Sequence, residues 1–133
     1  MKAAAILLVA LLGVVPGASR AQSCDLTAAA RVWAKCSACH SLDAPKVGAV
    51  GPSLLGLFGR SAGKSPGFTF SPAFRAARFT WNDTTFDDFL TDPQRVVPGN
   101  VMAFSGLRSG DDRKAISCVI RQGSTSQSAL QTR

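Results

Sequence analysis

The five residues Cys36-Ser37-Ala38-Cys39-His40 have the types and the spacing needed to hold an iron cofactor. Two cysteines two residues apart, followed directly by a histidine, match the attachment signature of a c-type haem. Each thiol can add across one haem vinyl group to form a thioether, and the histidine can bind the iron as an axial ligand. The segment therefore predicts one covalently attached haem c, with His40 on its iron.

A Cys-x-x-Cys pair also occurs in thioredoxin-like redox sites and in zinc sites. The redox site requires a βαβ pattern around the pair, and this sequence shows no strand pattern. A zinc site requires a second pair of ligands, and none follows in the sequence. The adjoining histidine therefore favours haem over both alternatives.

The residue types also restrict the sixth ligand of such an iron. His40 is the only histidine of the chain, and Met102 is the only methionine once Met1 is removed. An iron with six ordinary strong-field ligands would therefore take His40 on one side and Met102 on the other. Lysine amines can compete, usually at raised pH, where they lose their proton.

Residues 1–21 predict a secretory signal peptide, with a positive start, an apolar run over 3–15 and the small residues Ser19 and Ala21 before the cleavage site. A retained membrane anchor is the alternative, but an anchor needs roughly 20 apolar residues. A lipid on Cys24 is a second alternative, and the residues before it fit that modification poorly. Export agrees with haem attachment on the outer face of the bacterial inner membrane, so we expect a periplasmic protein without a membrane span.

Removal of the signal leaves 112 residues, the size of one small domain. We expect this domain over 22–123, followed by a polar and flexible tail over 124–133. Lys2 and Arg20 leave with the signal, so the mature chain has 13 basic and 8 acidic residues and a net charge of +5. No run of lysine and arginine indicates nucleic-acid binding. The mild positive charge instead suits docking to an acidic patch on a protein partner.

Apolar residues at helical spacing predict three main helices in an all-α fold. They cover about 25–36, a segment from 82 or 83 to the residue before Pro93, and a segment from about 111 to 123. A serine followed by a proline predicts a short helical turn over 71–76. The stretch 41–67 is rich in glycine and proline and predicts loop.

Several further segments resemble the class I cytochromes c, which are small soluble electron carriers. The resemblance covers nearly all of the mature chain and rests on Cys36–His40, Gly51–Arg60, Pro66–Phe70, Trp81 and Pro98–Phe104. The 62 residues from His40 to Met102 also match members of the family without insertions. The resemblance implies a small cytochrome c fold, with three main helices and loops wrapped around one covalently attached haem.

The resemblance assigns further residues to the cofactor. In the family, the residue matching Pro52 supports the histidine through its carbonyl, and those matching Arg60 and Trp81 lie near the haem propionates. Met102 matches the distal ligand of the iron. Without the resemblance, Arg60 would be interpreted as a solvated loop arginine.

The chain departs from the family pattern because it contains no tyrosine. Phe70 stands where the family usually has a tyrosine near a propionate, and Phe89 where it has one beside the methionine sulfur. Both rings can still pack on the porphyrin. Basic positions around the exposed haem edge are matched by Lys35, Arg95 and Arg108, which are the candidates for partner docking.

Cys24 and Cys118 remain after the haem takes two thiols. Free cysteines are uncommon in an oxidising compartment, and the family packs the first and last helices against each other, so we expect a disulfide between them. A buried thiol at Cys118 and a reactive one at Cys24 are the alternative.

The resemblance implies a monomeric one-electron carrier between a donor and an acceptor redox protein, and not an enzyme, because both axial positions of the iron are filled. Two alternatives stay open. The chain could be the dedicated cytochrome subunit of one dehydrogenase or oxidase complex, or a peroxidase-like protein or sensor with a labile sixth ligand.

Overall fold

The computed structural model describes residues 23–123 and 130, and in this part of the chain it is helical. Five helices occur there in the order α1 (Leu26–Cys36), α2 (Pro72–Ala76), α3 (Asp83–Thr91), α4 (Pro93–Val96) and α5 (Gly110–Gln122). The described residues form no strand, only one isolated bridge between Ser61 and Thr80. The predicted all-α fold with three main helices is therefore confirmed, and α2 and α4 are short additions. The predicted signal peptide and most of the predicted tail lie outside the described residues.

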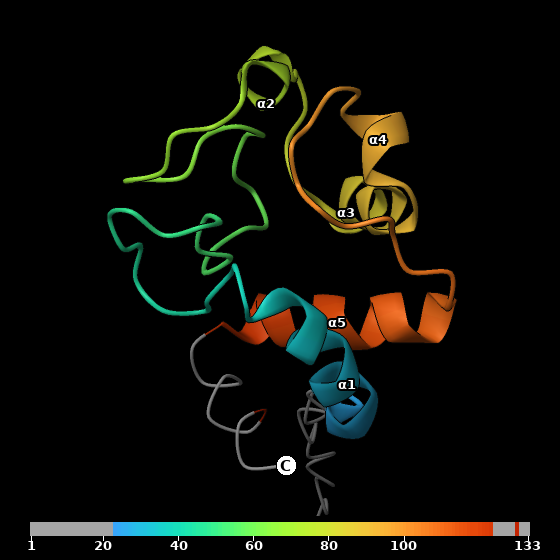
Figure 1. The fold of residues 1–133 in the computed structure, drawn as a ribbon. Coiled ribbons are helices and arrows are strands. Elements are labelled where there is room, and N and C mark those ends of the chain that lie inside the picture. Colours follow the sequence, from blue (N-terminus) through green and yellow to red (C-terminus); the bar gives the residue numbers. More distant parts are fainter. Residues whose placement is uncertain (1–22, 124–129, 131–133) are drawn as a thin grey trace, which may run out of the picture.

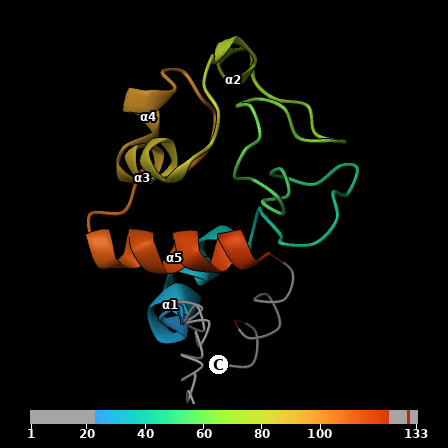
Figure 2. The ribbon, with the colours of Figure 1, turned by 180° about the vertical axis from the view of Figure 1, so that it is seen from behind.

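The helices and the long loop surround the centre of the molecule. In Figure 1, α5 runs across the lower part over α1, α3 and α4 lie on one side, and α2 lies at the end remote from α5. The loop between α1 and α2 closes the remaining side, and the view from behind in Figure 2 shows the same order. α5 packs against both α1 and α3, and their apolar faces form much of the core, which includes Val32, Trp33, Phe86, Leu90, Ile116, Val119 and Ile120.

Side-chain caps fix where the helices begin. The Asp25 carboxylate accepts a hydrogen bond from the backbone N–H of Ala28 (2.9 Å), so Asp25 caps α1. Asn82 and Thr85 form a reciprocal capping box at the start of α3, with bonds of 2.9 and 2.8 Å. Gly123 ends α5. These polar residues explain why the three main helices begin and end within a residue or two of the predicted bounds.

α4 is not among the helices predicted from the sequence. The preceding helix stops before Pro93 as predicted, but the chain then makes one further helical turn. Pro93 occupies the first turn of α4, and the Asp92 carboxylate accepts a hydrogen bond from the backbone N–H of Arg95 (3.1 Å). This turn leads the chain directly into the loop that carries Met102.

A disulfide joins Cys24 to Cys118, with the two Cα atoms 5.7 Å apart. It connects the segment just before the Asp25 cap of α1 to the second half of α5 and so reinforces the packing of these two helices. Leu130, the one described residue of the predicted tail, is buried. Among the described residues, no helix has the length and apolar character needed to span a bilayer.

Candidate haem-binding site

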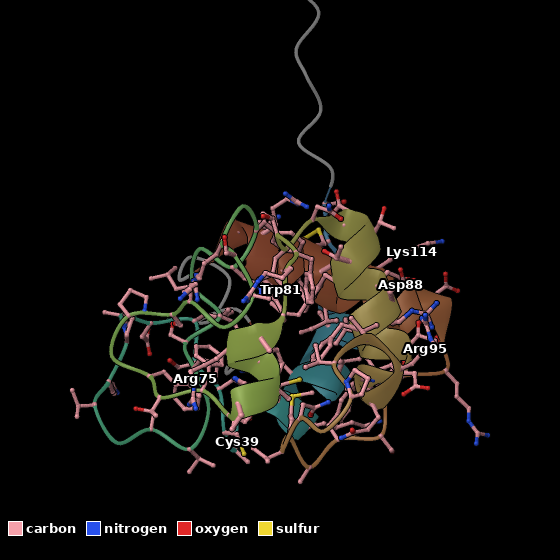
Figure 3. All side chains as sticks on the ribbon, turned by 90° about the horizontal axis from the view of Figure 1, so that it is seen from above. Cys39, Arg75, Trp81, Asp88, Arg95 and Lys114 are labelled. Carbon is pink, nitrogen blue, oxygen red and sulfur yellow. A yellow bond between two sulfur atoms is a disulfide. The ribbon has the colours of Figure 1, made fainter. Side chains whose placement is uncertain are left out.

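The centre of the molecule contains a cavity of about 310 Å³, within the range of roughly 300–1,000 Å³ that is usual for ligand pockets. Its walls come from α1, α2, α3 and α5 and from the loops between them. All nine residues that the sequence assigns to the cofactor line this cavity: Cys36, Cys39, His40, Pro52, Arg60, Phe70, Trp81, Phe89 and Met102. Figure 3 labels two of them, Cys39 and Trp81, which reach the cavity from the turn after α1 and from the segment before α3.

The end of α1 and the turn that follows it bring both thiols and the imidazole to the cavity. The backbone N–H groups of Cys39 and His40 both donate to the carbonyl of Cys36, at 3.0 and 2.8 Å, and these bonds tighten the chain immediately after the helix. Burial raises the pKa of the Cys36 thiol to about 11, against a smaller opposing effect of Lys35. Among the described residues, no three His, Cys or Asp side chains come together as a metal cluster. The second ligand pair that zinc would need is therefore absent from this site.

The His40 ring is held in one orientation. Its Nδ1–H donates to the Pro52 carbonyl at 2.7 Å, which leaves Nε2 as the nitrogen that can bind a metal. Burial lowers the pKa of His40 by more than this hydrogen bond raises it. The ring is therefore neutral near pH 7, and neutral imidazole is the form that binds metals. The carbonyl partner also fixes the tautomer, as is usual for metal-binding histidines.

Gly51 leaves the space that the His40 ring occupies. A Cβ atom at Gly51 would lie 2.8 Å from Cε1 and 2.9 Å from Nδ1 of that ring. We expect Gly51→Ala to push the ring away from Pro52 and to lower the stability of the haem protein by about 1–3 kcal/mol, the usual cost of overpacking. Thermal unfolding followed by the Soret band measures this loss.

Gly110→Ala is the matched control for that substitution. A Cβ atom at Gly110 meets no other atom closer than 3.6 Å, so the variant should unfold like the parent protein. Equal unfolding temperatures of the Gly51 and Gly110 variants would contradict the proposed contact.

Aromatic rings form a large apolar wall of the cavity. Trp81 and Phe89 are buried and meet edge to face, with ring centroids 5.2 Å apart. Phe74 contacts Phe89 at 5.7 Å and Phe70 at 5.6 Å. Rings in such contact hold one another in place, so this wall is a firm surface for a flat apolar ligand.

Arg60 supplies positive charge at the cavity. Its guanidinium donates to the carbonyl of Leu55, to the carbonyl of Ser53 (3.2 Å) and to the Ser65 hydroxyl (2.9 Å). Burial lowers the pKa of Arg60, but a guanidinium stays protonated in proteins. Lys64 also lines the cavity, and none of the lining residues is acidic. The site therefore suits an apolar cofactor with carboxylate groups, such as haem.

Met102 reaches the same cavity from the loop between α4 and α5. Its side chain is half-buried, and its backbone N–H donates to the side-chain oxygen of Asn100 at 3.0 Å. Asn100 has no role among the sequence-based predictions. Its only signal in the sequence is that it is an amide residue two positions before the expected ligand. Its burial could not be predicted, because the amide donates to the carbonyls of Pro93 and Val97 at the α4 turn, which was not predicted either.

The three docking candidates are not gathered together. Lys35 is exposed and borders the cavity. Arg95 donates to the Asp88 carboxylate at 3.2 Å, and Figure 3 places this pair well away from Cys39. Arg108 is exposed in the segment before α5. Of the three, only Lys35 lies at the cavity itself.

Comparisons with known proteins agree with this site. The chain is 40% identical over 98 residues to the cytochrome c2 of Rhodoblastus acidophilus, covering 74% of this chain and 92% of that protein. It is 49% identical over 81 residues to cytochrome c2 iso-2 of Magnetospirillum molischianum, covering 61% and 82% of the two chains. Among solved structures, cytochrome cH from Methylobacterium extorquens superposes with a TM-score of 0.66 at 31% identity, covering 74% of this chain and 98% of that one. No family model matches the chain.

The matches cover 82–98% of the length of these three proteins. The residues at the cavity of this chain fit the cofactor that the sequence predicts. Two unbridged cysteines, a neutral imidazole, a thioether, a firm aromatic wall and uncompensated cations all line one space. The chain belongs to the class I cytochromes c, electron carriers with one covalently attached haem c.

Proposed function

We propose that the chain is a periplasmic carrier of single electrons between two redox proteins, with His40 and Met102 as the axial ligands of its haem iron. The observation that carries this proposal is that the Cys36-to-His40 turn and Met102, which lie far apart in the sequence, line one apolar cavity. When bound, the haem supplies an iron that accepts and releases one electron.

The protein residues around the iron favour electron transfer over catalysis. His40, held by Pro52, and Met102 would fill both axial positions and leave none for a substrate. The cavity is lined by no carboxylate and by no second histidine, the groups most often used for acid–base steps. A thioether ligand also raises the reduction potential relative to a second histidine, as suits a carrier. A subunit dedicated to one enzyme complex would have the same site.

Covalent attachment of the haem is the first test. Protein exported in a host that attaches haem c should exceed the mass of residues 22–133 by one haem, and acid-acetone should fail to extract it. A Cys36→Ala/Cys39→Ala variant should release any haem that it binds. Release of the haem from the unaltered protein would contradict the proposal. The same mass shows whether the signal is cleaved after Ala21.

Docking of the partner is the second test. Electron transfer to an acidic acceptor protein should slow as salt rises, because exposed charges are screened over about 10 Å at 0.1 M. Lys35→Glu should lower the association rate, since Lys35 is exposed at the cavity, and Arg108→Glu should do the same. Stopped-flow kinetics at several ionic strengths measure both effects.

Lys114→Glu is the matched control for charge reversal. Lys114 is exposed on α5, and its ammonium lies 3.8 Å from the Asp111 carboxylate. Figure 3 shows Lys114 remote from Cys39, so this variant should change the rate less than Lys35→Glu. Rates that do not respond to salt would show that the basic residues guide no partner.

A further inference from the structure

Asn100 is a buried polar residue inside an otherwise exposed loop. Its side chain is 6% exposed, whereas the next residue, Val101, is 81% exposed. The Asn100 Nδ2 group donates to the carbonyls of Pro93 (3.0 Å) and Val97 (2.9 Å), and its Oδ1 accepts from the backbone N–H of Met102 (3.0 Å). The amide therefore connects the α4 turn directly to the backbone of the expected ligand.

Gln94, which lies within α4, also binds this loop. Its Nε2 group donates to the backbone carbonyl of Asn100 at 2.9 Å, and its Oε1 accepts from the backbone N–H of Gly99 at 3.1 Å. A turn closes the loop as well, because the Asn100 N–H donates to the Val97 carbonyl at 3.1 Å. The two side-chain amides thus make five hydrogen bonds, of which four join residues 93–97 to residues 99–100 and one lies within the loop, between Asn100 and Met102.

The side chains on either side of Met102 contribute little apolar packing to this part of the loop. Val101 and Ala103, which flank Met102, are both exposed, so neither side chain fixes the backbone. The Met102 side chain has three rotatable bonds and adapts to irregular space. Its sulfur therefore keeps a fixed position only if its backbone is anchored by other contacts. The side-chain contacts that anchor this backbone are the amide hydrogen bonds of Asn100 and Gln94.

We infer that Asn100 and Gln94 are positioning residues that keep the Met102 sulfur at the haem iron. The inference rests on the proposed function, because it takes Met102 as the axial ligand. Neither amide touches the cofactor in this role. Each acts through the loop backbone, so that detachment of the sulfur requires the loop to leave α4 and break these bonds.

The test measures how often the sulfur leaves the iron in the ferric holoprotein. Cyanide binds only after a sixth ligand has left, so its binding rate at saturating cyanide reports detachment. Asn100→Ala should raise this rate by about tenfold, since it removes three hydrogen bonds of modest net strength. Gln94→Ala should raise it by about threefold. Both variants should also lose, at lower temperature than the parent, the weak charge-transfer band that marks iron–sulfur ligation.

Asn100→Asp separates the two ends of the amide. The carboxylate can still accept from the Met102 N–H, but it can no longer donate to the Pro93 and Val97 carbonyls. Faster cyanide binding by this variant is expected and shows that the anchor to α4 is required.

Thr85→Ala is the control for a general loss of stability. It removes the Thr85 half of the capping box of α3, while Asn82 still caps the helix, and should lower the unfolding temperature modestly. The inference requires that this variant bind cyanide at the parent rate. It is overturned if Thr85→Ala accelerates binding as much as Asn100→Ala, or if the two amide variants bind cyanide like the parent. If Asn100→Ala fails to load haem, the cyanide-binding rate of Gln94→Ala is compared with those of Thr85→Ala and the parent, and the same outcomes support or overturn the inference.

The parent protein distinguishes this inference from the proposed function. A ferric parent that lacks the charge-transfer band and binds cyanide at once would show that Met102 is not the ligand, and both proposals would fail. A parent with the band, together with amide variants that behave like it, would leave methionine ligation intact and refute the positioning role alone.

Discussion

Replacement of Met102 by alanine should open the sixth coordination position of the iron and lower the reduction potential by on the order of 100 mV. The direction follows from the ligand, since a soft neutral thioether favours the ferrous state. A shift of this size is a modest part of the range of about 0.8 V over which axial ligands set haem potentials. The charge-transfer band of the ferric protein should disappear and cyanide should bind without delay. Redox titration and absorption spectra measure these effects.

Val101→Ala is the matched control for this experiment. Val101 is the adjacent residue and is mostly exposed, so its truncation should leave the band and the potential unchanged. A ferric protein with unaltered Met102 that already lacks the band would favour the enzyme or sensor interpretation, because the sixth position would then be open.

Loss of the disulfide should cause the largest change in stability. A bridge between Cys24 and Cys118 closes a loop of 94 residues, for which the chain-entropy model gives a stabilisation of about 4.7 kcal/mol. The attached haem already restricts the unfolded chain, so the measured loss should be smaller. Denaturant unfolding of the Cys24→Ser/Cys118→Ser holoprotein, compared with the parent, gives the value.

Reduction provides the control for the disulfide. With the haem of both proteins already in the ferrous state, a thiol reductant should destabilise the parent by the same amount and leave the double variant unchanged. Non-reducing peptide mapping should recover the two cysteines in one linked fragment. Alkylation of both thiols in the native, oxidised protein, or a lipid on Cys24, would show that the bridge does not form.

Local sequence signals predicted the main helices well. Asp25, Asn82 and Gly123 cap or end helices by contacts that involve only nearby residues, so their effect is visible in the sequence. The haem attachment signature from Cys36 to His40 is also visible in the sequence, because its two thiols and its imidazole lie within five consecutive residues. The short helix α4 has the same local signal as α2, a capping side chain followed by a proline, at Asp92 and Pro93. It was not predicted because four residues cannot show a helical period and Pro93 was interpreted only as the end of the preceding helix.

The contacts that support the ligands depend on tertiary structure and could not be predicted in this way. Gly51 matters because its backbone passes against the His40 ring, a contact that spacing does not reveal. The burial of Asn100 depends on α4, and the bonds of Gln94 depend on the same turn. Family resemblance placed Arg60 and Trp81 at the cavity, where the structure also has them, although neither lies in a regular helix.

The pairing of Cys24 with Cys118 bears on the order of events during biogenesis. The first and last of the four cysteines are joined, and the two that the haem requires lie between them in the chain. A chain exported from its amino end would present Cys24 to Cys36 and Cys39 well before Cys118 emerges. An oxidant acting on that partial chain would form a bridge that consumes a thiol needed for the cofactor, and only thiol exchange could recover it. The native bridge can form only when α5 has reached α1. In an oxidising compartment, cofactor loading would therefore require late oxidation or a catalyst of thiol exchange.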